Sequence, residues 1–144
     1  MTGEKTVDDF HRELGHCLWE NVGMTRNEEG LKRALEKIGS ISKDFHSGTI
    51  VPGSAEGVND ELTKAMMAAD FISIGELITK DALQRQESCG GHFREESQTP
   101  SHEAQRNDEN FSHVQAWEYS ESGHLMIKEP LTFEHAKPAT RNYA

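Results

Sequence analysis

The side chains most able to do chemistry are concentrated in residues 85–95, which read Arg-Gln-Glu-Ser-Cys-Gly-Gly-His-Phe-Arg-Glu. Ionisable and polar groups surround a pair of glycines, Gly90 and Gly91. Glycine allows a tight turn, and neighbouring charges can lock such a turn through charge-assisted hydrogen bonds. The pattern therefore predicts a helix end followed by a structural turn, held by ion pairs and hydrogen bonds among Arg85, Glu87, His92 and Arg94.

The same segment could also be interpreted as a catalytic site or as a metal site, but the sequence supports both less well than it supports a structural turn. Cys89 could act as a nucleophile with His92 as its base, but no oxyanion donor or third orienting group can be named. A zinc site needs four ligands, and Cys89 with His92 supplies one pair without a second at matching spacing. None of the 12 glycines forms the Gly-x-Gly-x-x-Gly pattern of a dinucleotide cradle. We therefore predict no catalytic, cofactor-binding or metal-binding residue in this chain.

Charge and composition restrict the partners. Fifteen Lys and Arg against 25 Asp and Glu give a net charge of −10, so nucleic acid and anionic membrane surfaces would be repelled. No apolar run approaches the ~20 residues that span a bilayer. Two cysteines are too few for a secreted disulfide framework, which favours a reducing compartment such as the cytoplasm. Hydrophobic residues make up 34% of the chain, which is low enough to predict that part of it needs a partner surface.

Helical periodicity predicts the first two elements that position this segment. The first helix begins after Thr6 as its N-cap and ends at Gly23. Thr25 and Glu28 have the spacing of a capping box that would start a second helix, which ends near Gly48. The apolar positions are Val7, Phe10, Leu14, Cys17 and Leu18 in the first helix and Leu31, Leu35, Ile38 and Phe45 in the second.

A third predicted helix is the longest, from Asn59 as N-cap to about Glu87. It has two apolar stripes, so one side can contact the first two helices and the other side can contact something else. Exposed residues of the second stripe could also drive formation of a homodimer. The first stripe is Leu62, Met66 and Ala69, and the second is Met67, Phe71, Ile74 and Ile78.

After the third helix the pattern changes. Residues 95–110 are polar and irregular, and residues 111–133 have a period of two that predicts a small β-hairpin with its turn at residues 120–123. The predicted fold class is mainly α, an up-down-up, spectrin-repeat-like three-helix bundle followed by an irregular C-terminal segment with the hairpin. We expect residues 1–94 to hold the bundle and the Gly turn, and residues 95–144 to form an extended tail of the same domain.

Four segments, in this order, resemble the C-terminal domain of the flavoprotein subunits of succinate dehydrogenase and fumarate reductase. Residues 15–31 resemble the start of that domain, where a helix ends in an Asn-x-Gly-x-x-Arg turn. Residues 85–92 resemble its R-x-E-S-R-G-A-H segment, residues 106–111 its R-D-D-E-N-W/F segment, and residues 141–143 its terminal R-S-Y or R-T-Y. The order and spacing cover nearly the whole chain and make the resemblance specific to this superfamily.

The sequence also departs from parts of that superfamily. Cys89 and Gly91 stand where mitochondrial-type members have Arg and Ala. Residues 89–96, with residues 117–119, look more like the bacterial branch that pairs with a single dihaem cytochrome b anchor. Three alternatives stay open at this point. They are the C-terminal domain of L-aspartate oxidase, which shares a similar E-S-R-G-x-H turn, a free-standing helical interaction module, and a metal-binding module.

The resemblance implies that the parent subunit is an FAD-dependent succinate dehydrogenase or fumarate reductase. Its partners would be its own FAD and capping domains, an iron-sulfur subunit and a cytochrome b anchor, which hold it peripherally on the inner face of the plasma membrane. In the family the dinucleotide fold and the dicarboxylate-binding residues lie upstream, so this chain alone is expected to bind no FAD and to be no enzyme. The residues offered as a structural interface are Arg85, Glu87, Ser88, Gly90, Gly91, His92, Arg94, Arg106, Asp108 and Glu109.

Overall fold

The computed structural model describes residues 4–54, 56–121 and 123–139. The chain divides into two compact units, residues 1–84 (the first unit) and residues 85–144 (the second unit). Our division after residue 94, and the expectation that both parts belong to one domain, stay predictions. The first unit contains β1 (Lys5–Thr6), α1 (Val7–Val22), β2 (Thr25–Arg26), α2 (Glu28–Gly48), β3 (Thr49–Ile50) and α3 (Asp60–Gln84); the second contains β4 (Phe93–Arg94), α4 (Asp108–Phe111), β5 (His113–Ser120) and β6 (Gly123–Pro130).

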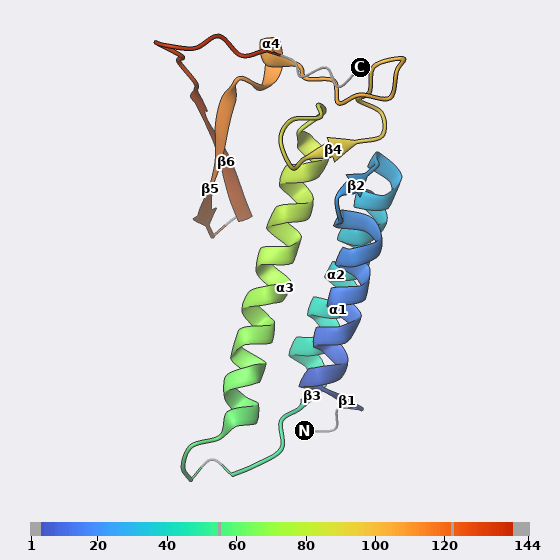
Figure 1. Ribbon diagram of the computed structural model, residues 1–144. Coiled ribbons are helices and arrows are strands. Elements are labelled where there is room, and N and C mark those ends of the chain that lie inside the picture. Colours follow the sequence, from blue (N-terminus) through green and yellow to red (C-terminus); the bar gives the residue numbers. More distant parts are fainter. Residues whose placement is uncertain (1–3, 55, 122, 140–144) are drawn as a thin grey trace. The chain divides into compact units, whose positions relative to one another are not determined.

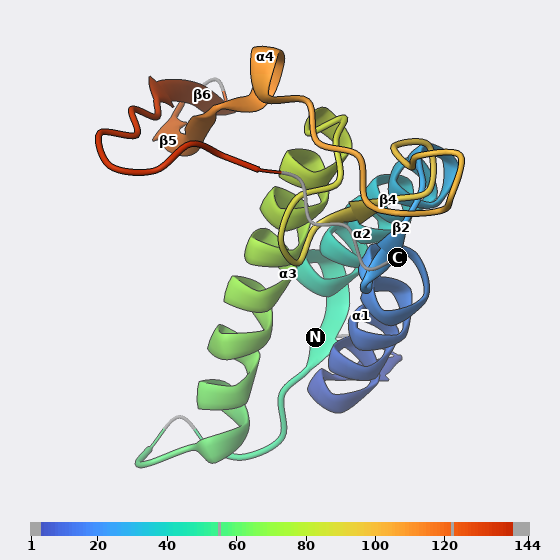
Figure 2. The ribbon, with the colours of Figure 1, turned by 45° about the horizontal axis from the view of Figure 1, so that its top comes forward.

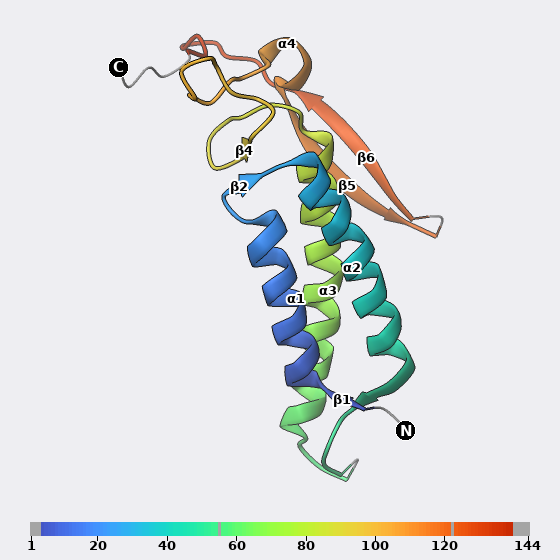
Figure 3. The ribbon, with the colours of Figure 1, turned by 90° about the vertical axis from the view of Figure 1, so that its right-hand side faces the viewer.

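Three long helices of the first unit run up, down and up beside one another, as Figures 1 and 3 show from two sides. This is the predicted three-helix bundle. At one end, β1 and β3 pair in parallel, Lys5 with Thr49 and Thr6 with Ile50, which ties the start of α1 to the end of α2. The connection from β3 to α3 leaves the bundle at this same end (Figure 2). No helix within the described ranges is long and apolar enough to cross a lipid bilayer.

Helix α1 begins and ends where the sequence predicts. The Thr6 hydroxyl accepts a hydrogen bond from the Asp9 amide, and the Asp9 carboxylate accepts one from the Thr6 amide, so both halves of a capping box are present. Gly23 is the C-cap. Asn59 accepts hydrogen bonds from two amides in the first turn of α3, which confirms its role at that helix start. The predicted end of α3 is three residues too late, because the helix stops at Gln84.

The predicted capping box of α2 is wrong. The helix begins at Glu28, and Asn27 is its N-cap, with the Asn27 carboxamide oxygen 2.8 Å from the Gly30 amide nitrogen. Thr25 lies two residues earlier, in β2. A helix has one N-cap, and asparagine accepts from the third amide of the helix at least as well as threonine does. The predicted end near Gly48 is confirmed.

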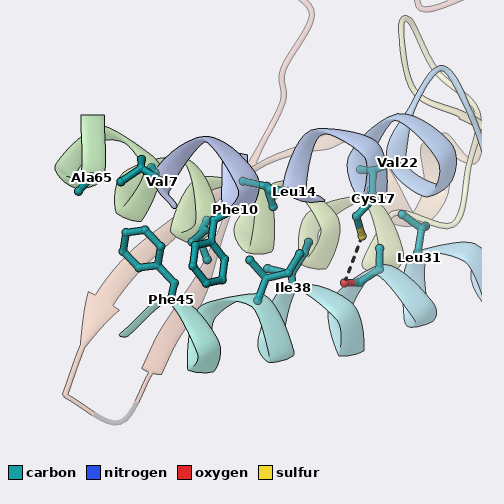
Figure 4. Packing of buried hydrophobic residues seen from close by; sticks show 14 residues of the cluster. Val7, Phe10, Leu14, Cys17, Val22, Leu31, Ile38, Phe45 and Ala65 are labelled. Carbon is teal, nitrogen blue, oxygen red and sulfur yellow. Dashed lines mark hydrogen bonds between the residues drawn. The ribbon is translucent and has the colours of Figure 1, made fainter. Parts of the chain in front are cut away.

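Large side chains of α1 and α2 fill the core of the bundle. Figure 4 shows Phe10 and Leu14 of α1 facing Ile38 and Phe45 of α2. The rings of Phe10 and Phe45 meet edge to face, with centroids 5.4 Å apart. The buried hydrophobic residues are Val7, Phe10, Leu14, Cys17 and Val22 of α1, Leu31, Ala34, Ile38, Ile41 and Phe45 of α2, and Ala65, Ala68, Ile72 and Ala82 of α3.

Helix α3 meets this core through mostly small residues, which we call the inner seam. Its members are Ala65, Ala68, Ile72, Gly75, Thr79 and Ala82, all buried and spaced alternately by three and four residues. In the first predicted stripe, Leu62 and Met66 do not face the core, since they are 50% and 64% exposed, whereas Ala69 is partly buried and packs against it. The cause is space. A methyl group added at Gly75 would come within 3.3 Å of Leu18, so little room remains for larger side chains.

The predicted hairpin is confirmed in the second unit. Strands β5 and β6 pair antiparallel from His113 with Pro130 to Ser120 with Gly123. The Ser120 hydroxyl donates to the Gly123 carbonyl, and Gly123 has a φ of 121°, a region that glycine enters without steric cost. None of the buried hydrophobic residues described in the chain lies in this unit. Its order must therefore come largely from polar contacts.

The Glu13 carboxylate of α1 forms ion pairs with two lysines outside that helix. Glu13 accepts a hydrogen bond from Lys5 at 2.7 Å and another from Lys37 on α2. These hydrogen bonds, Lys37 first and Lys5 second, lower the pKa of Glu13 below its ordinary value. Because the pKa is lowered on folding, the contribution to stability is present at neutral pH and is lost as the pH falls through the pKa of the folded state.

We predict that Asn27→Ala lowers the free energy of unfolding by about 1 kcal/mol, because the Gly30 amide loses its acceptor. Thr25→Ala should cost much less, since Thr25 does not cap the helix. Urea titrations of both variants followed by circular dichroism measure the difference. Equal losses of unfolding free energy in the two variants would show that the Asn27 side chain does not stabilise the start of α2.

Glu13→Gln should cost about 0.5–1 kcal/mol at neutral pH and progressively less in acid, where the native carboxylate is also neutral. The matched control is Glu29→Gln, because the Glu29 side chain is 90% exposed and its contact with Arg33 is 3.8 Å long. Unfolding measured over a range of pH compares the two. A cost for Glu13→Gln that persists unchanged at low pH would contradict the assignment to charge.

Candidate functional site

A buried carboxylate organises the polar centre of the second unit. Glu87 is 2% exposed. One of its oxygens accepts a hydrogen bond from Arg85 at 2.5 Å, and the other accepts one from the backbone amide of Asn107 at 2.9 Å. Burying a charge is costly unless it is paired and hydrogen-bonded, and here both oxygens have partners. Glu87 thereby joins segments that are 20 residues apart in the sequence.

The guanidinium of Arg85 extends the same network to the start of the hairpin. It donates to the backbone carbonyls of His113 at 2.9 Å and Phe111 at 3.4 Å. Its central carbon lies 5.8 Å from the centroid of the Phe111 ring, a cation–π distance. The planar fork of arginine allows it to contact one carboxylate and two carbonyls at once. The Arg85–Glu87 pair therefore fixes the positions of residues 107–113.

The glycine pair forms a tight turn beside this network. Cys89 and His92 exchange two backbone hydrogen bonds across Gly90 and Gly91, at 2.8 and 3.1 Å. Gly90 has a positive φ of 61°, which explains why glycine stands there. The imidazole Nε2 of His92 lies 2.9 Å from the carbonyl oxygen of Arg85. The turn is thus held at its base by backbone pairing and from one side by His92.

Ser88 locks the chain that leaves the turn. Its hydroxyl oxygen accepts a hydrogen bond from the Arg94 amide at 2.8 Å and lies 3.2 Å from the Arg94 carbonyl oxygen, to which it donates. The Ser88 amide donates to the carbonyl of Gln105. The side chain of Arg94 is buried and donates to Glu96 at 3.1 Å. A serine that is fully buried, as Ser88 is, needs such partners.

Three further predicted positions lie at the start of α4. Arg106 donates twice to Asp108, at 2.6 and 2.9 Å, and this hydrogen bonding is the first cause of the raised pKa of Arg106. Asn107 is the N-cap of α4, accepting from the Asn110 amide. Glu109 is exposed and takes no part in the hydrogen bonds of Glu87 described above. The Arg106–Asp108 pair borders the network, whereas Glu109 stands apart.

The sequence missed the groups that complete this arrangement. They are backbone atoms, the amide of Asn107 and the carbonyls of Gln105, Phe111 and His113, which leave no side-chain signal to find. In the described part of the chain, no buried side-chain nitrogen or oxygen lacks a hydrogen-bond partner. Nor do these residues include a group of three or more His, Cys, Asp or Glu that could hold a metal ion. The buried polar side chains of the network thus all have hydrogen-bond partners among the described residues.

Comparison with known proteins gives relatives over almost the whole length of the chain. Residues 11–143 match the family described as the fumarate reductase flavoprotein C-term. An uncharacterized FAD-dependent oxidoreductase of Methanocaldococcus jannaschii is 33% identical over 96 residues, 67% of this chain and 17% of that protein. The fumarate reductase flavoprotein subunit of Haemophilus influenzae is 24% identical over 143 residues, 98% of this chain and 22% of that subunit.

A solved structure shares the fold. A chain of a quinol-fumarate reductase with menaquinol molecules superimposes with a TM-score of 0.81 and 19% identity, covering 95% of this chain and 23% of that one. At this identity the likeness concerns the fold, and it confirms the predicted mainly α class. The chain spans about a fifth of the length of the relatives that it matches.

We predict that Glu87→Gln loosens the second unit locally. One amide oxygen could still accept from Asn107, but the amide NH₂ group would then face the Arg85 donors. Removing one charge of a buried pair costs about 3–5 kcal/mol. Hydrogen exchange of the Asn107 and Ser88 amides should accelerate, whereas the matched control Glu109→Gln, at an exposed position, should leave both unchanged. Unchanged protection in Glu87→Gln would remove the proposed central role of this carboxylate.

Proposed function

Because the chain belongs to the fumarate reductase flavoprotein C-terminal family, we propose that it serves as the C-terminal helical domain of an FAD-containing succinate dehydrogenase or fumarate reductase subunit. The observation that carries the proposal is the family match over residues 11–143. The role of the domain is structural. It supplies contacts to the rest of the subunit and no group to the reaction.

Two features support placing FAD outside this chain. The sequence has no Gly-x-Gly-x-x-Gly segment. The longest strands, β5 and β6, form an antiparallel hairpin and not the strand–turn–helix unit that cradles a dinucleotide phosphate. The proposal therefore places FAD, the capping domain and every step of succinate–fumarate interconversion in other parts of the parent subunit.

Within this role, the segment from Arg85 to Glu95 is the proposed contact between domains. Its internal hydrogen bonds give it one rigid conformation before it meets a partner, which reduces the entropy cost of docking. A methyl group added at Gly90 or Gly91 would meet no atom within 4 Å in this chain, so the tip of the turn is open to a neighbouring surface. The interface set extends to Arg106, Asp108 and Glu109.

The proposed partners follow from the parent complex. They are the FAD and capping domains of the same subunit, an iron-sulfur subunit and a cytochrome b anchor of the dihaem type, which would hold the subunit peripherally at the inner face of the plasma membrane. The structural relative, a quinol-fumarate reductase, supports a quinone-linked complex of this kind. L-aspartate oxidase is not favoured, because the named relatives are a fumarate reductase subunit and an FAD-dependent oxidoreductase.

The free-standing interaction module is the remaining alternative, and gene context separates it from our proposal. We expect the reading frame upstream of Met1, or a neighbouring gene, to encode a flavoprotein region with a Gly-x-Gly-x-x-Gly strand–turn–helix unit. A stop codon just before Met1, with no such region nearby, would favour the module.

The purified chain should bind no FAD and should not reduce an artificial acceptor with succinate, because the proposal places the residues for both in other regions. Flavin absorbance after ultrafiltration measures binding, and the intact Haemophilus influenzae subunit is the positive control for activity. Stoichiometric FAD in the protein fraction, or succinate-dependent reduction of the acceptor, would contradict the assignment of catalysis to other regions.

A further inference from the structure

The outer side of α3 carries a second row of residues, which we call the outer seam. Its members are Lys64, Met67, Phe71, Ile74, Ile78 and Asp81. They follow the same three–four spacing as the inner seam and precede its members by one residue each. The four central residues are large and apolar, and each is between 42% and 51% exposed. A continuous apolar row with this spacing is the pattern by which two helices pack along their length.

Two shallow grooves run between the outer seam and α1. They have volumes of about 260 and 310 Å³, and both are lined by His11 of α1 and Phe71 of α3. The centroids of the His11 and Phe71 rings lie 5.8 Å apart. The second groove continues along Leu14 and Leu18 to Ile78. A helix placed on the outer seam could therefore insert its side chains between α1 and α3, as ridges enter grooves in helix packing.

The outer seam is complementary to itself. When two copies are set antiparallel about a two-fold axis, Met67 of one faces Ile78 of the other and Phe71 faces Ile74. The same operation sets Lys64 opposite Asp81 at both ends, whereas a parallel pairing would set like charges together. Self-complementarity is what a two-fold interface requires. We propose that two copies of this chain associate through the outer seams of α3 as an antiparallel pair.

The contacts that Lys64 makes within the chain do not oppose this pairing. Lys64 bonds to Glu61 at 2.6 Å, an exposed pair between residues three apart on the same helix. Such pairs contribute little, so the ammonium group can turn towards a carboxylate at the end of the seam. The charges at the seam ends thus select the antiparallel orientation, while the apolar centre supplies the attraction.

The size of the seam sets the strength of association. Four half-exposed large side chains present on the order of 400 Å² of apolar surface. A stable interface buries about 800 Å² per partner, so this pair should be weak, with a dissociation constant in roughly the micromolar range. The dimer is therefore expected to depend on concentration.

Sedimentation equilibrium from about 1 to about 300 μM tests the proposal, since this range brackets a micromolar constant. The apparent mass should rise from 16.2 kDa towards twice that value. Met67→Asp, in the seam, should weaken association at least about tenfold, because it places a charge in the apolar contact. Met66→Asp is the matched control, the next residue of the same helix and even more exposed, and it should have little effect.

A charge exchange tests the orientation independently. Lys64→Glu should weaken the dimer about fivefold at low salt, because it sets two carboxylates opposite each other, and the effect should shrink as salt is added. The double variant Lys64→Glu with Asp81→Lys restores opposite charges and should restore affinity. Far-ultraviolet circular dichroism verifies that each variant is folded.

Two results would overturn the proposal. One is a mass of 16.2 kDa at every concentration, which would assign the outer seam to other polypeptide of the flavoprotein. The other is association that both methionine variants reduce equally, or that the charge exchange fails to restore, which would place the contact elsewhere on the chain. Neither result depends on the proposed function, because the measurement uses no flavin and no dicarboxylate.

Discussion

The inner seam of α3 meets a core that Phe10, Leu14, Ile38 and Phe45 have already filled from α1 and α2. Mostly small side chains fit between these residues and the α3 backbone, and at Gly75 even a methyl group would come within 3.3 Å of Leu18. Tight packing leaves no space for both sets of large side chains. Most large apolar residues of α3 therefore lie at least partly exposed, and Ile72 is the one that is buried among the described residues of this helix. The exposed row is a consequence of how the core is packed.

The second unit is held by a different kind of interaction. The buried hydrophobic residues described in the chain all belong to the first unit, while Glu87, Ser88, Arg94 and His113 of the second unit are buried polar residues. Hydrogen bonds and ion pairs are directional, so they specify one conformation of residues 85–113 even without an apolar core. Their net contribution to stability is smaller than that of apolar burial of the same extent. This unit is thus well defined in shape and modest in stability.

These two properties suit a domain that works through contacts. In the polar network around Glu87, every buried side-chain nitrogen and oxygen of the described residues has a hydrogen-bond partner. The first unit offers an apolar helix face, and the second offers an open glycine turn. In the flavoprotein that we propose as the parent, the cofactor would perform the difficult chemistry and the polypeptide would position it. The structural role that we propose would contribute to that positioning by fixing the surfaces on which other domains rest.

The sequence by itself determined the three helices, the caps at Thr6, Gly23 and Asn59, and the hairpin, because each depends on local periodicity or on side chains three residues apart. It also located residues 85–95 as the densest polar segment, although their role as an interface stays a prediction. The expected terminal Arg-Asn-Tyr match at 141–143 lies outside the described residues. It could not choose the buried face of α3, since hydrophobicity favours large residues and only the volume left by the other two helices selects small ones. The partners of Glu87 and Arg85 were equally hidden, because they are backbone groups about 20 to 28 residues away, brought close only by the folded chain.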